Sequence, residues 1–518
     1  MEFGILSLLP PVIAIVLALI TRNVIPALFA GVWLGATMLY GWNPFLGLYK
    51  SFSDFIIPSV GDPWSATVLI YCGLFGVLIA FLQKTGGAHA IANAISQKVK
   101  TPRGAQGSTM VFGLIIFFED YFNALTVGSV MRSVTDKMRV SREKLAYVVD
   151  STSAPMCLLG PVSTWVVFVM GLIGAQYAEL GISESEYMTY IFSIPFNFYS
   201  ILAIILVGII VFLKWDFGPM AQAEYRARTS GKVYRDDAAP PSDDQMSDVE
   251  MPEGYTPKIR NMIVPIVVLV AMIPPLFLWT GGYPDKGLVT AFGEADGATS
   301  ILIAAFTAAI VAMVMGMQQK LYTFKESMDI IVSGFRSMML VYIILTLAWS
   351  IGSVTTELGT AEYIVHFVEQ TTSPIVIPVL LFAIGAVVAF TTGTSYGTFA
   401  IMIPIAMPLA ASMDISMYLA IAAVFSGGIF GDHCSPISDT TILSSAGSGS
   451  DHIDHVNTQI PYAITAGVSG IVSFLTVGIT GSPLVALIVG AVVLFVLAFI
   501  LNKTWGKQIP DEYGTVQS

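Results

Sequence analysis

The chain has 518 residues, of which 55% are hydrophobic and only 11% carry a charge, with a formal net charge of -11. Soluble domains carry roughly 25% charged residues, so this composition excludes an ordinary soluble protein. Apolar runs of about 17 to 25 residues recur along the chain, and each is long enough to cross a bilayer core as a helix. The first run is preceded by Glu2 and followed by Arg22, unlike a signal peptide. We therefore expect an all-α polytopic membrane protein that retains this first span.

Hydropathy predicts about 11 transmembrane helices in chain order. They cover residues 4–21, 24–41, 64–83, 143–176, 190–213, 261–280, 298–317, 337–353, 416–448, 460–480 and 484–502. Two further apolar segments, 107–136 and 373–412, are too long for one helix and are interrupted by polar and glycine residues. We expect these two segments to be re-entrant hairpins. The spans 143–176 and 416–448 should be broken helices.

The basic residues predict the orientation, because Lys and Arg accumulate in cytoplasmic loops. With the N-terminus outside, 22 of the 24 Lys and Arg residues fall on the cytoplasmic side, and only Lys50 and Lys286 lie outside. Basic residues flank both ends of the first hairpin, whereas acidic residues alone flank the second. The hairpins should therefore enter from opposite faces. The expected location is the bacterial inner membrane, with a cytoplasmic C-terminus.

The same order of elements occurs twice, which predicts two inverted-topology repeats of five spans each. Residues 118–126 align with 390–398 at an offset of 272, and 161–163 align with 436–438 at an offset of 275. The predicted domains are a first repeat, a cytoplasmic acidic linker, a second repeat and an extra C-terminal helix with its tail. Their bounds are 1–214, 215–258, 259–480 and 481–518.

Five carboxylates fall at membrane depth, where an ionisable side chain is costly unless it faces a polar cavity or a partner. They are Glu119, Asp120, Asp150, Asp432 and Asp439. Pro436 should open the second broken span and expose carbonyl oxygens, and the first broken span should open twice, at Pro155 and at Pro161. Hard oxygen ligands of this kind suit a sodium ion.

The candidate cation- and proton-binding residues are these acids together with nearby hydroxyl and amide side chains. The additional residues are Asn123, Thr126, Ser153, Ser163, Thr394, Ser395, Thr398, Ser435 and Ser438. The predicted Na+ ligands are Asp439, Ser438 and Ser395. No cofactor is expected beyond Na+ as the transported or coupling ion.

Structural interpretations of the same residues stay open. Asp432 and Asp439 also suit caps of the two half-helices, and residues 391–397 suit a tight turn. His433 is interpreted as a hydrogen-bonded structural residue, and the aromatic side chains near the hairpin tips as packing. The acids and histidines of residues 451–455 are interpreted as a solvated loop face.

At these motifs the sequence resembles a known family, the NhaC-type sodium/proton antiporters. The resemblance rests on residues 430–445, with Gly431-Asp432-His433-Cys434-Ser435-Pro436-Ile437-Ser438-Asp439, and on 451–455, 459–462, 117–121 and 150–155. It implies a secondary active transporter that works by alternating access, with Na+/H+ antiport as the leading function. Related carriers couple sodium to amino acids or organic acids, so Na+-coupled transport of a small organic solute stays open. The resemblance also implies a homodimer with a scaffold domain and a moving transport domain.

An enzyme is not expected. An intramembrane aspartyl protease would need a Gly-x-Gly-Asp motif and a Tyr-Asp pair. Here Gly428 and the glycine directly before Asp432 are separated by two residues instead of one, and Asp150 follows Val149 instead of a tyrosine. The expected partners are membrane lipid, Na+, H+ and a small organic solute, and no nucleic acid.

Overall fold

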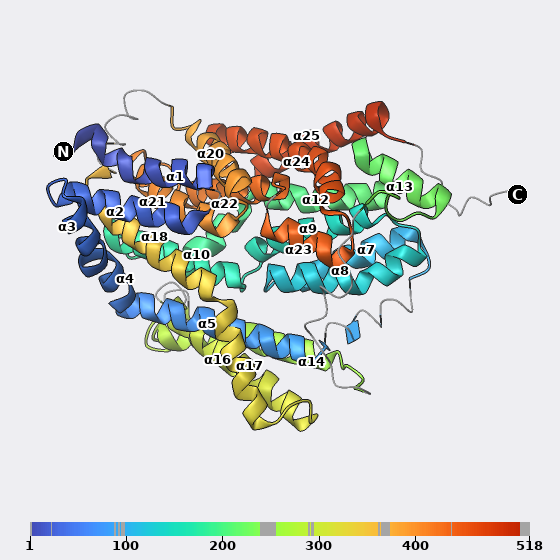
Figure 1. The fold of residues 1–518 in the computed structure, drawn as a ribbon, viewed down its shortest axis with the longest axis horizontal. Coiled ribbons are helices and arrows are strands. Elements are labelled where there is room, and N and C mark those ends of the chain that lie inside the picture. The colour runs from blue at the N-terminus through green and yellow to red at the C-terminus, as the bar shows by residue number, and fades with distance from the viewer. Residues whose placement is uncertain are drawn as a thin grey trace, which may run out of the picture.

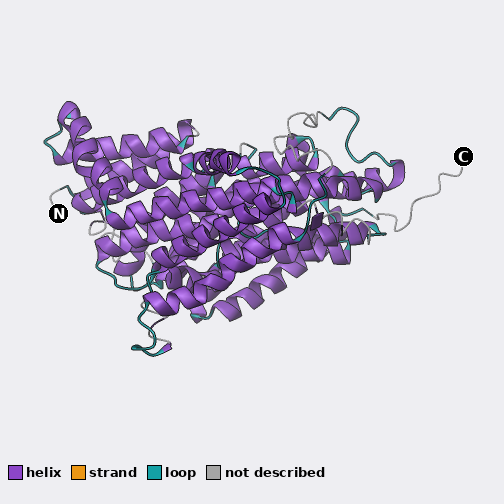
Figure 2. Cartoon of the chain, turned by 90° about the horizontal axis from the view of Figure 1, so that it is seen from below, coloured by secondary structure: helices purple, strands orange, loops and turns teal. Residues whose placement is uncertain are grey.

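The computed structural model describes residues 3–507 except 22, 88–89, 92–93, 95–98, 239–254, 289–290, 292–294, 361–362, 364–372 and 437. Within these residues the chain is helical, and the helices are joined by turns without a β-sheet (Figures 1 and 2). The helices of the first half are α1 (Leu9–Thr21), α2 (Val24–Leu39), α3 (Pro44–Lys50), α4 (Ile57–Gly61), α5 (Pro63–Lys84), α7 (Pro102–Ile115), α8 (Asp120–Lys137), α9 (Arg142–Leu159), α10 (Thr164–Leu180), α11 (Glu186–Ser193), α12 (Phe198–Leu213) and α13 (Gly218–Ser230). Those of the second half are α14 (Arg260–Thr280), α16 (Gly297–Gln318), α17 (Phe324–Ser337), α18 (Met339–Glu357), α20 (Ile377–Thr392), α21 (Ser395–Ser412), α22 (Met417–Cys434), α23 (Asp439–Ser448), α24 (His452–Thr480) and α25 (Pro483–Trp505).

Eight of the described helices are long and apolar enough to cross a membrane, and up to 11 spans result if each of three bent pairs counts as one. This confirms the all-α polytopic fold. The broken span 143–176 is the pair α9 and α10, bent by 45°. The span 416–448 is interrupted between Cys434 and Asp439, as the sequence predicts. The order of helical hairpin, broken helix and further helix occurs in both halves, whereas the re-entrant course of the hairpins and the inverted orientation of the halves stay predictions.

Several sequence-based boundaries are wrong. Pro155 lies inside α9, so the first broken span opens only once, because the helix tolerates the loss of a single backbone hydrogen bond within buried surroundings. The span 190–213 is not straight, since α11 and α12 meet at a bend of 49°. Residues 218–230 of the predicted linker form α13, while 239–254 lie outside the described residues. The helix α24 begins at His452 instead of residue 460, because the Asp451 side chain caps it.

The helices of the two halves interlock around the hairpin α7–α8. Helix α8 packs along α23, and the two backbones approach closely at Gly128 and Gly447 (Figure 1). A Cβ atom on Gly128 would lie 2.7 Å from the carbonyl carbon of Gly447, too close for any other residue without a shift of the helices. Small residues commonly allow such close helix packing in membranes. The first hairpin is thereby fixed against the broken helix of the second half.

This close contact predicts the effect of a single methyl group. Gly128→Ala should destabilise the chain by about 1–3 kcal/mol, because backbone lies opposite the added atom and neither helix can move without displacing the other. Gly208→Ala in α12 is the matched control, since its Cβ would meet only a Met110 side-chain atom at 3.9 Å. Thermal unfolding of both variants in detergent checks this. Equal melting temperatures would contradict the close contact.

A second group of helices lies apart from the hairpins and broken helices. Helices α5, α14, α16 and α17 occupy the lower part of Figure 1, while α20, α24 and α25 lie along the upper edge. Helix α5 packs against α16 and α17, and it also contacts α10. The contact between α5 and α17 is made through Gly76 and Gly334. A cavity separates this group from the hairpin tips.

Candidate functional site

The tip of each hairpin is hydrogen-bonded to the broken helix of its own half. At the first tip, the backbone N–H of Thr164 donates to the carbonyl of Phe118 at 3.0 Å. At the second, the backbone N–H of Asp439 donates to the carbonyl of Gly393 at 3.3 Å. The Ser435 hydroxyl also donates to the carbonyl of Phe390 at 2.6 Å. Each hairpin and its broken helix therefore form one connected unit.

The break between α22 and α23 holds two of the five predicted acids. Asp432 is fully buried near the end of α22, and its Oδ2 accepts a hydrogen bond from the Thr440 hydroxyl at 2.6 Å, while its Oδ1 has no partner. Asp439 begins α23, and its Oδ1 accepts from the backbone N–H of Thr440 at 2.9 Å. Its Oδ2 accepts from the hydroxyl of Tyr121, at the tip of the first hairpin. A carboxylate of one half is thus bonded to the hairpin of the other.

The two neighbouring acids of the first hairpin have different surroundings. The Glu119 carboxylate caps α8 by accepting from the backbone N–H of Phe122. Asp120 is the first residue of α8 and is completely buried, and neither of its carboxylate oxygens has a hydrogen-bond partner. The positive end of the α8 dipole favours negative charge there. Asp120 also lies within electrostatic reach of Glu119 and Asp439, so these acids form one group.

Asp150 connects the first broken helix to the second half of the chain. Its Oδ1 accepts from the Ser444 hydroxyl at 3.1 Å, and its Oδ2 accepts from the Thr441 hydroxyl at 3.1 Å and from the Gln459 amide at 2.5 Å. The Gln459 amide also donates to the carbonyl of His433 at 3.0 Å. Asp150 is therefore well satisfied by neutral donors, unlike Asp120.

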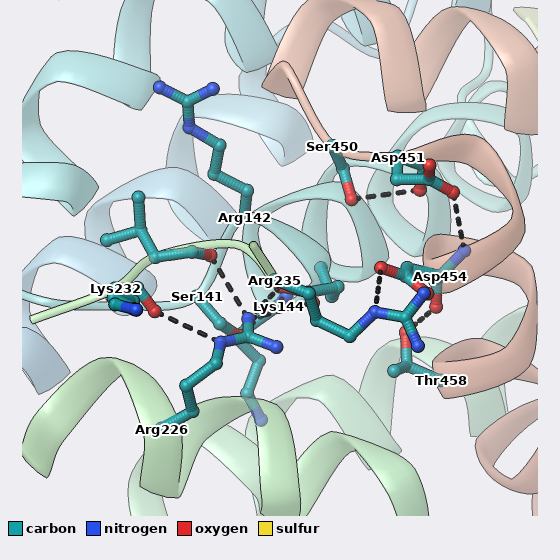
Figure 3. Close-up of polar contacts among 12 residues, drawn as sticks. Ser141, Arg142, Lys144, Arg226, Lys232, Arg235, Ser450, Asp451, Asp454 and Thr458 are labelled. Carbon is teal, nitrogen blue, oxygen red and sulfur yellow. Dashed lines mark hydrogen bonds and ion pairs between the residues drawn. The ribbon is translucent and has the colours of Figure 1, made fainter. Parts of the chain in front are cut away.

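None of the five acids forms an ion pair with a described Lys, Arg or His residue. Elsewhere in the described part of the chain, buried acids are paired: Lys144 with Asp216, and Arg226 with Glu143 at 2.8 Å. Figure 3 shows basic residues of that region, where Arg235 reaches Asp454 at 3.0 Å. Buried carboxylates are costly unless a cation or a proton neutralises them. The five acids lack such a partner in the part of the chain that the structure describes.

A cavity of about 210 Å³ is lined by Glu119, but by none of the other four acids. Glu119, Tyr121 and Tyr396 of the hairpin tips line one side, and residues of α5, α17 and α18 line the other, among them Gln83 and Ser337. The cavity therefore lies between the hairpin tips and the group of helices that contains α5 and α17. Movement of one group against the other would open or close it.

Most of the predicted hydroxyl and amide residues are bonded to nearby backbone. The Asn123 amide donates to the carbonyls of Gly113, Ile116 and Thr152, which holds the first hairpin closed. The hydroxyls of Ser153, Ser163, Ser395 and Thr398 donate to the carbonyls of Asp150, Cys157, Gly428 and Thr394 respectively. Thr126 is buried, and the Thr394 hydroxyl is buried without a partner.

Of the three predicted Na+ ligands, Ser438 and Asp439 are adjacent at the start of α23, whereas Ser395 lies in the second hairpin. Ser438 caps α23 directly beside Asp439, and its hydroxyl lies 3.0 Å from that of Thr440. Ser395 lies beyond the second hairpin tip, whose Gly393 carbonyl accepts from Asp439. Among the described residues, no three His, Cys, Asp or Glu side chains are arranged to hold a metal ion. A sodium site here would depend on hydroxyl and carbonyl oxygens, and it stays a prediction.

The structure also adds residues that sequence reasoning missed. Tyr121 donates to Asp439 although an aromatic beside a hairpin tip is typical of packing, and Gln459 donates to Asp150. The interpretation of residues 451–455 as a solvated face is wrong for Asp454, which is buried, and for His455, which is fully buried between Ser445 (2.8 Å) and Gln459 (2.9 Å). Tyr121 and Gln459 are more than 300 residues away from their acids in the sequence, and His455 lies in a part of α24 that was predicted to be a loop. No local sequence pattern indicates these contacts.

Comparison with known proteins assigns the family. A model of the Na+/H+ antiporter family matches residues 156–479, which is more than half of the chain and includes the second hairpin and both helix breaks. The chain belongs to the Na+/H+ antiporter family. Because this is a family of transporters, the prediction of a transporter rather than an enzyme is confirmed, as is the resemblance found in the motifs.

Individual proteins are similar to this chain over different lengths. An uncharacterized protein of Haemophilus influenzae is 34% identical over 510 residues, which cover 96% of this chain and 95% of the relative. The malate-2H(+)/Na(+)-lactate antiporter of Bacillus subtilis is 26% identical over 178 residues, 34% of this chain and 38% of the relative. The crystal structure of the YdaH transporter of Alcanivorax borkumensis has a similar fold, with a TM-score of 0.56 at 14% identity, over 85% of this chain and 90% of that one.

Proposed function

We propose that this antiporter-family protein exchanges Na+ for H+ across the bacterial inner membrane by alternating access. The observation that carries the proposal is the group of five carboxylates, four of them buried and Asp439 partly buried, which have no ion-pair partner among the described residues. Each buried charge must be neutralised, and a sodium ion and a proton are two alternative ways to do so. Competition between them at one group of acids is the basis of exchange.

The arrangement of the helices supports the transport cycle. Each hairpin is hydrogen-bonded to its broken helix, so we infer that the two hairpins and two broken helices move together against α5, α14, α16 and α17. Rigid-body movement of one bundle against another is a common route to alternating access. A homodimer would hold the second group still, with the N-terminus outside and the C-terminus in the cytoplasm.

The test is transport by the full chain in proteoliposomes that contain a pH-sensitive dye. An outward or inward Na+ gradient should drive proton flux in the opposite direction without any added solute, whereas a K+ gradient should not. Li+ serves as a second small cation, and empty liposomes give the background. Proton flux that fails to appear with Na+ alone would overturn antiport of these two ions.

A Na+-coupled carrier of a small organic solute is the second candidate. The cavity of about 210 Å³ beside Glu119 and Tyr121 favours it, since this volume admits a small carboxylate or amino acid next to the proposed cation site. The name of the Bacillus subtilis relative, which includes malate and lactate, points to the same class of solute. Amino acids and carboxylates that raise the melting temperature only in the presence of Na+ would favour this candidate. Solute-independent proton flux would favour the first.

A further inference from the structure

A second cavity, of about 360 Å³, lies where α12 ends. Its walls come from the beginning of α7, the end of α12 and the region of α13. It shares no lining residue with the cavity beside the hairpin tips, and none of the five acids reaches it. The transport cycle proposed above makes no use of it.

Both acids in its wall are already bonded to donors of the protein. Asp216 forms the buried ion pair with Lys144 and accepts from the Tyr462 hydroxyl at 2.8 Å. Glu224 accepts from the backbone N–H of Ser141 at 2.7 Å, from the Ser141 hydroxyl at 2.9 Å and from the Gln106 amide at 3.2 Å. Each acid of the wall is therefore already held by donors of the protein, and Glu224 also meets Arg228 of the same wall at 3.2 Å.

Three basic side chains line the same cavity: Arg103, Lys214 and Arg228. The Nε atom of Arg228 is buried without an acceptor, although the other end of its guanidinium meets Glu224 at 3.2 Å. The pKa of Lys214 is lowered, first by partial burial and then by the positive charges of Arg103 and Arg228. Lys214 therefore lies in the positive field of Arg103 and Arg228, and an anion bound between them would lower that repulsion.

The position and the apolar wall restrict the kind of anion. Arg103 lies in the first turn of α7, where the helix dipole attracts negative charge. Ile210 and Val211 line the cavity, and the next residues, Phe212 and Leu213, are 53% and 45% exposed. Lys214 follows directly, so the apolar surface of α12 ends at the mouth of the cavity. An anion attached to an apolar tail would match both parts.

We propose that this cavity binds a phosphate group at the membrane surface, from an anionic phospholipid head group or from free phosphate. Basic pockets between helices at the membrane boundary commonly hold phospholipid head groups. Lys214 is the C-cap of α12, with a left-handed backbone φ of 59°, so its charge stands where the apolar surface of the helix ends. Arg103 and Arg228 hold the phosphate from the α7 and α13 sides.

The experiment titrates three probes into the full-length protein in detergent: phosphatidylglycerol, phosphatidylcholine and inorganic phosphate. Native mass spectrometry measures bound lipid, and thermal unfolding measures stabilisation by each probe. The wild-type chain should retain phosphatidylglycerol in preference to phosphatidylcholine. The double variant Arg103→Gln/Lys214→Gln should bind it about 30-fold more weakly, because each basic residue near an anionic lipid surface contributes roughly a fivefold factor.

The matched control is Lys320→Gln/Lys325→Gln, which removes the same charge from two exposed lysines outside the cavity. Lys320 has nearly the same backbone conformation as Lys214, with φ of 58°. The control should bind phosphatidylglycerol like the wild type. If phosphate alone stabilises the wild type and not the cavity variant, the ligand is free phosphate. Equal binding of phosphatidylglycerol by the cavity and control variants, without stabilisation by phosphate, would overturn the proposal.

Discussion

Asp120→Asn is expected to abolish Na+-driven proton exchange while the melting temperature stays the same or rises. Both Asp120 oxygens are buried without a hydrogen-bond partner, so replacing the carboxylate removes no internal bond. Burying an unsatisfied polar group costs about 1–3 kcal/mol, and more for a charge, so the neutral amide lowers this cost. Exchange should fall to the background of empty proteoliposomes, because the amide cannot take up or release a proton. A variant that is both more stable and inactive would identify Asp120 as a functional acid.

Asp439→Asn tests the same group of acids from the other half of the chain. It retains an oxygen that accepts from Tyr121, and exchange should again fall to background. The control is Asp414→Asn, an exposed acid whose backbone φ of 54° suits asparagine. Melting temperature and proton flux should both be unchanged in this control. Normal exchange in Asp120→Asn and in Asp439→Asn would refute the assignment of these acids.

Lys144→Met is expected to destabilise the chain by about 3–5 kcal/mol, because it leaves the Asp216 charge buried without its cation. The Lys144 side chain is fully buried and that of Asp216 is 6% exposed, so little solvent reaches the charge that is left behind. Asp216 would retain only neutral donors such as the Tyr462 hydroxyl. Chemical unfolding in detergent, followed by tryptophan fluorescence, measures the loss.

Two further variants separate the lost charge from the lost packing. The double variant Lys144→Met/Asp216→Asn should recover part of the stability, since it removes the remaining charge. Lys232→Met breaks an exposed pair with Asp236 and should cost no more than about 1 kcal/mol. A Lys144→Met protein as stable as Lys232→Met would show that the buried pair contributes little.

The fold was predictable to the extent that it depends on local composition. Each long apolar run is helical in the structure, as one helix or as two. The interruption at Pro436 lies where the proline and its polar neighbours predict it. Pro155 did not have that effect, since α9 continues to Leu159 through buried surroundings. Helix α13 and the start of α24 were missed because both combine polar sequence with a buried face. Hydropathy cannot detect helices of that kind.

The candidate site was predicted as a list of residues but not as an arrangement. The five acids were identifiable because charges are rare in apolar runs. Their different environments were not, since Asp120 has no hydrogen bond while Asp150 accepts three. His455 is buried although it stands in a short run with Asp451, His452 and Asp454. If the acids bind Na+ and H+ as proposed, these differences in environment would set which acid takes which ion.

The sequence by itself therefore predicted a membrane transporter with two hairpins, two broken helices and five carboxylates within its apolar segments. Hydropathy, proline and charge act within one or two helix turns, so a single chain segment suffices to predict them. Only the tertiary structure decided that Tyr121 bonds to Asp439, 318 residues away, and that Gln459 bonds to Asp150, 309 residues away. The basic cavity at the end of α12 likewise forms only because α7, α12 and α13 pack together. Such contacts depend on how whole helices pack, and no local pattern in the chain encodes them.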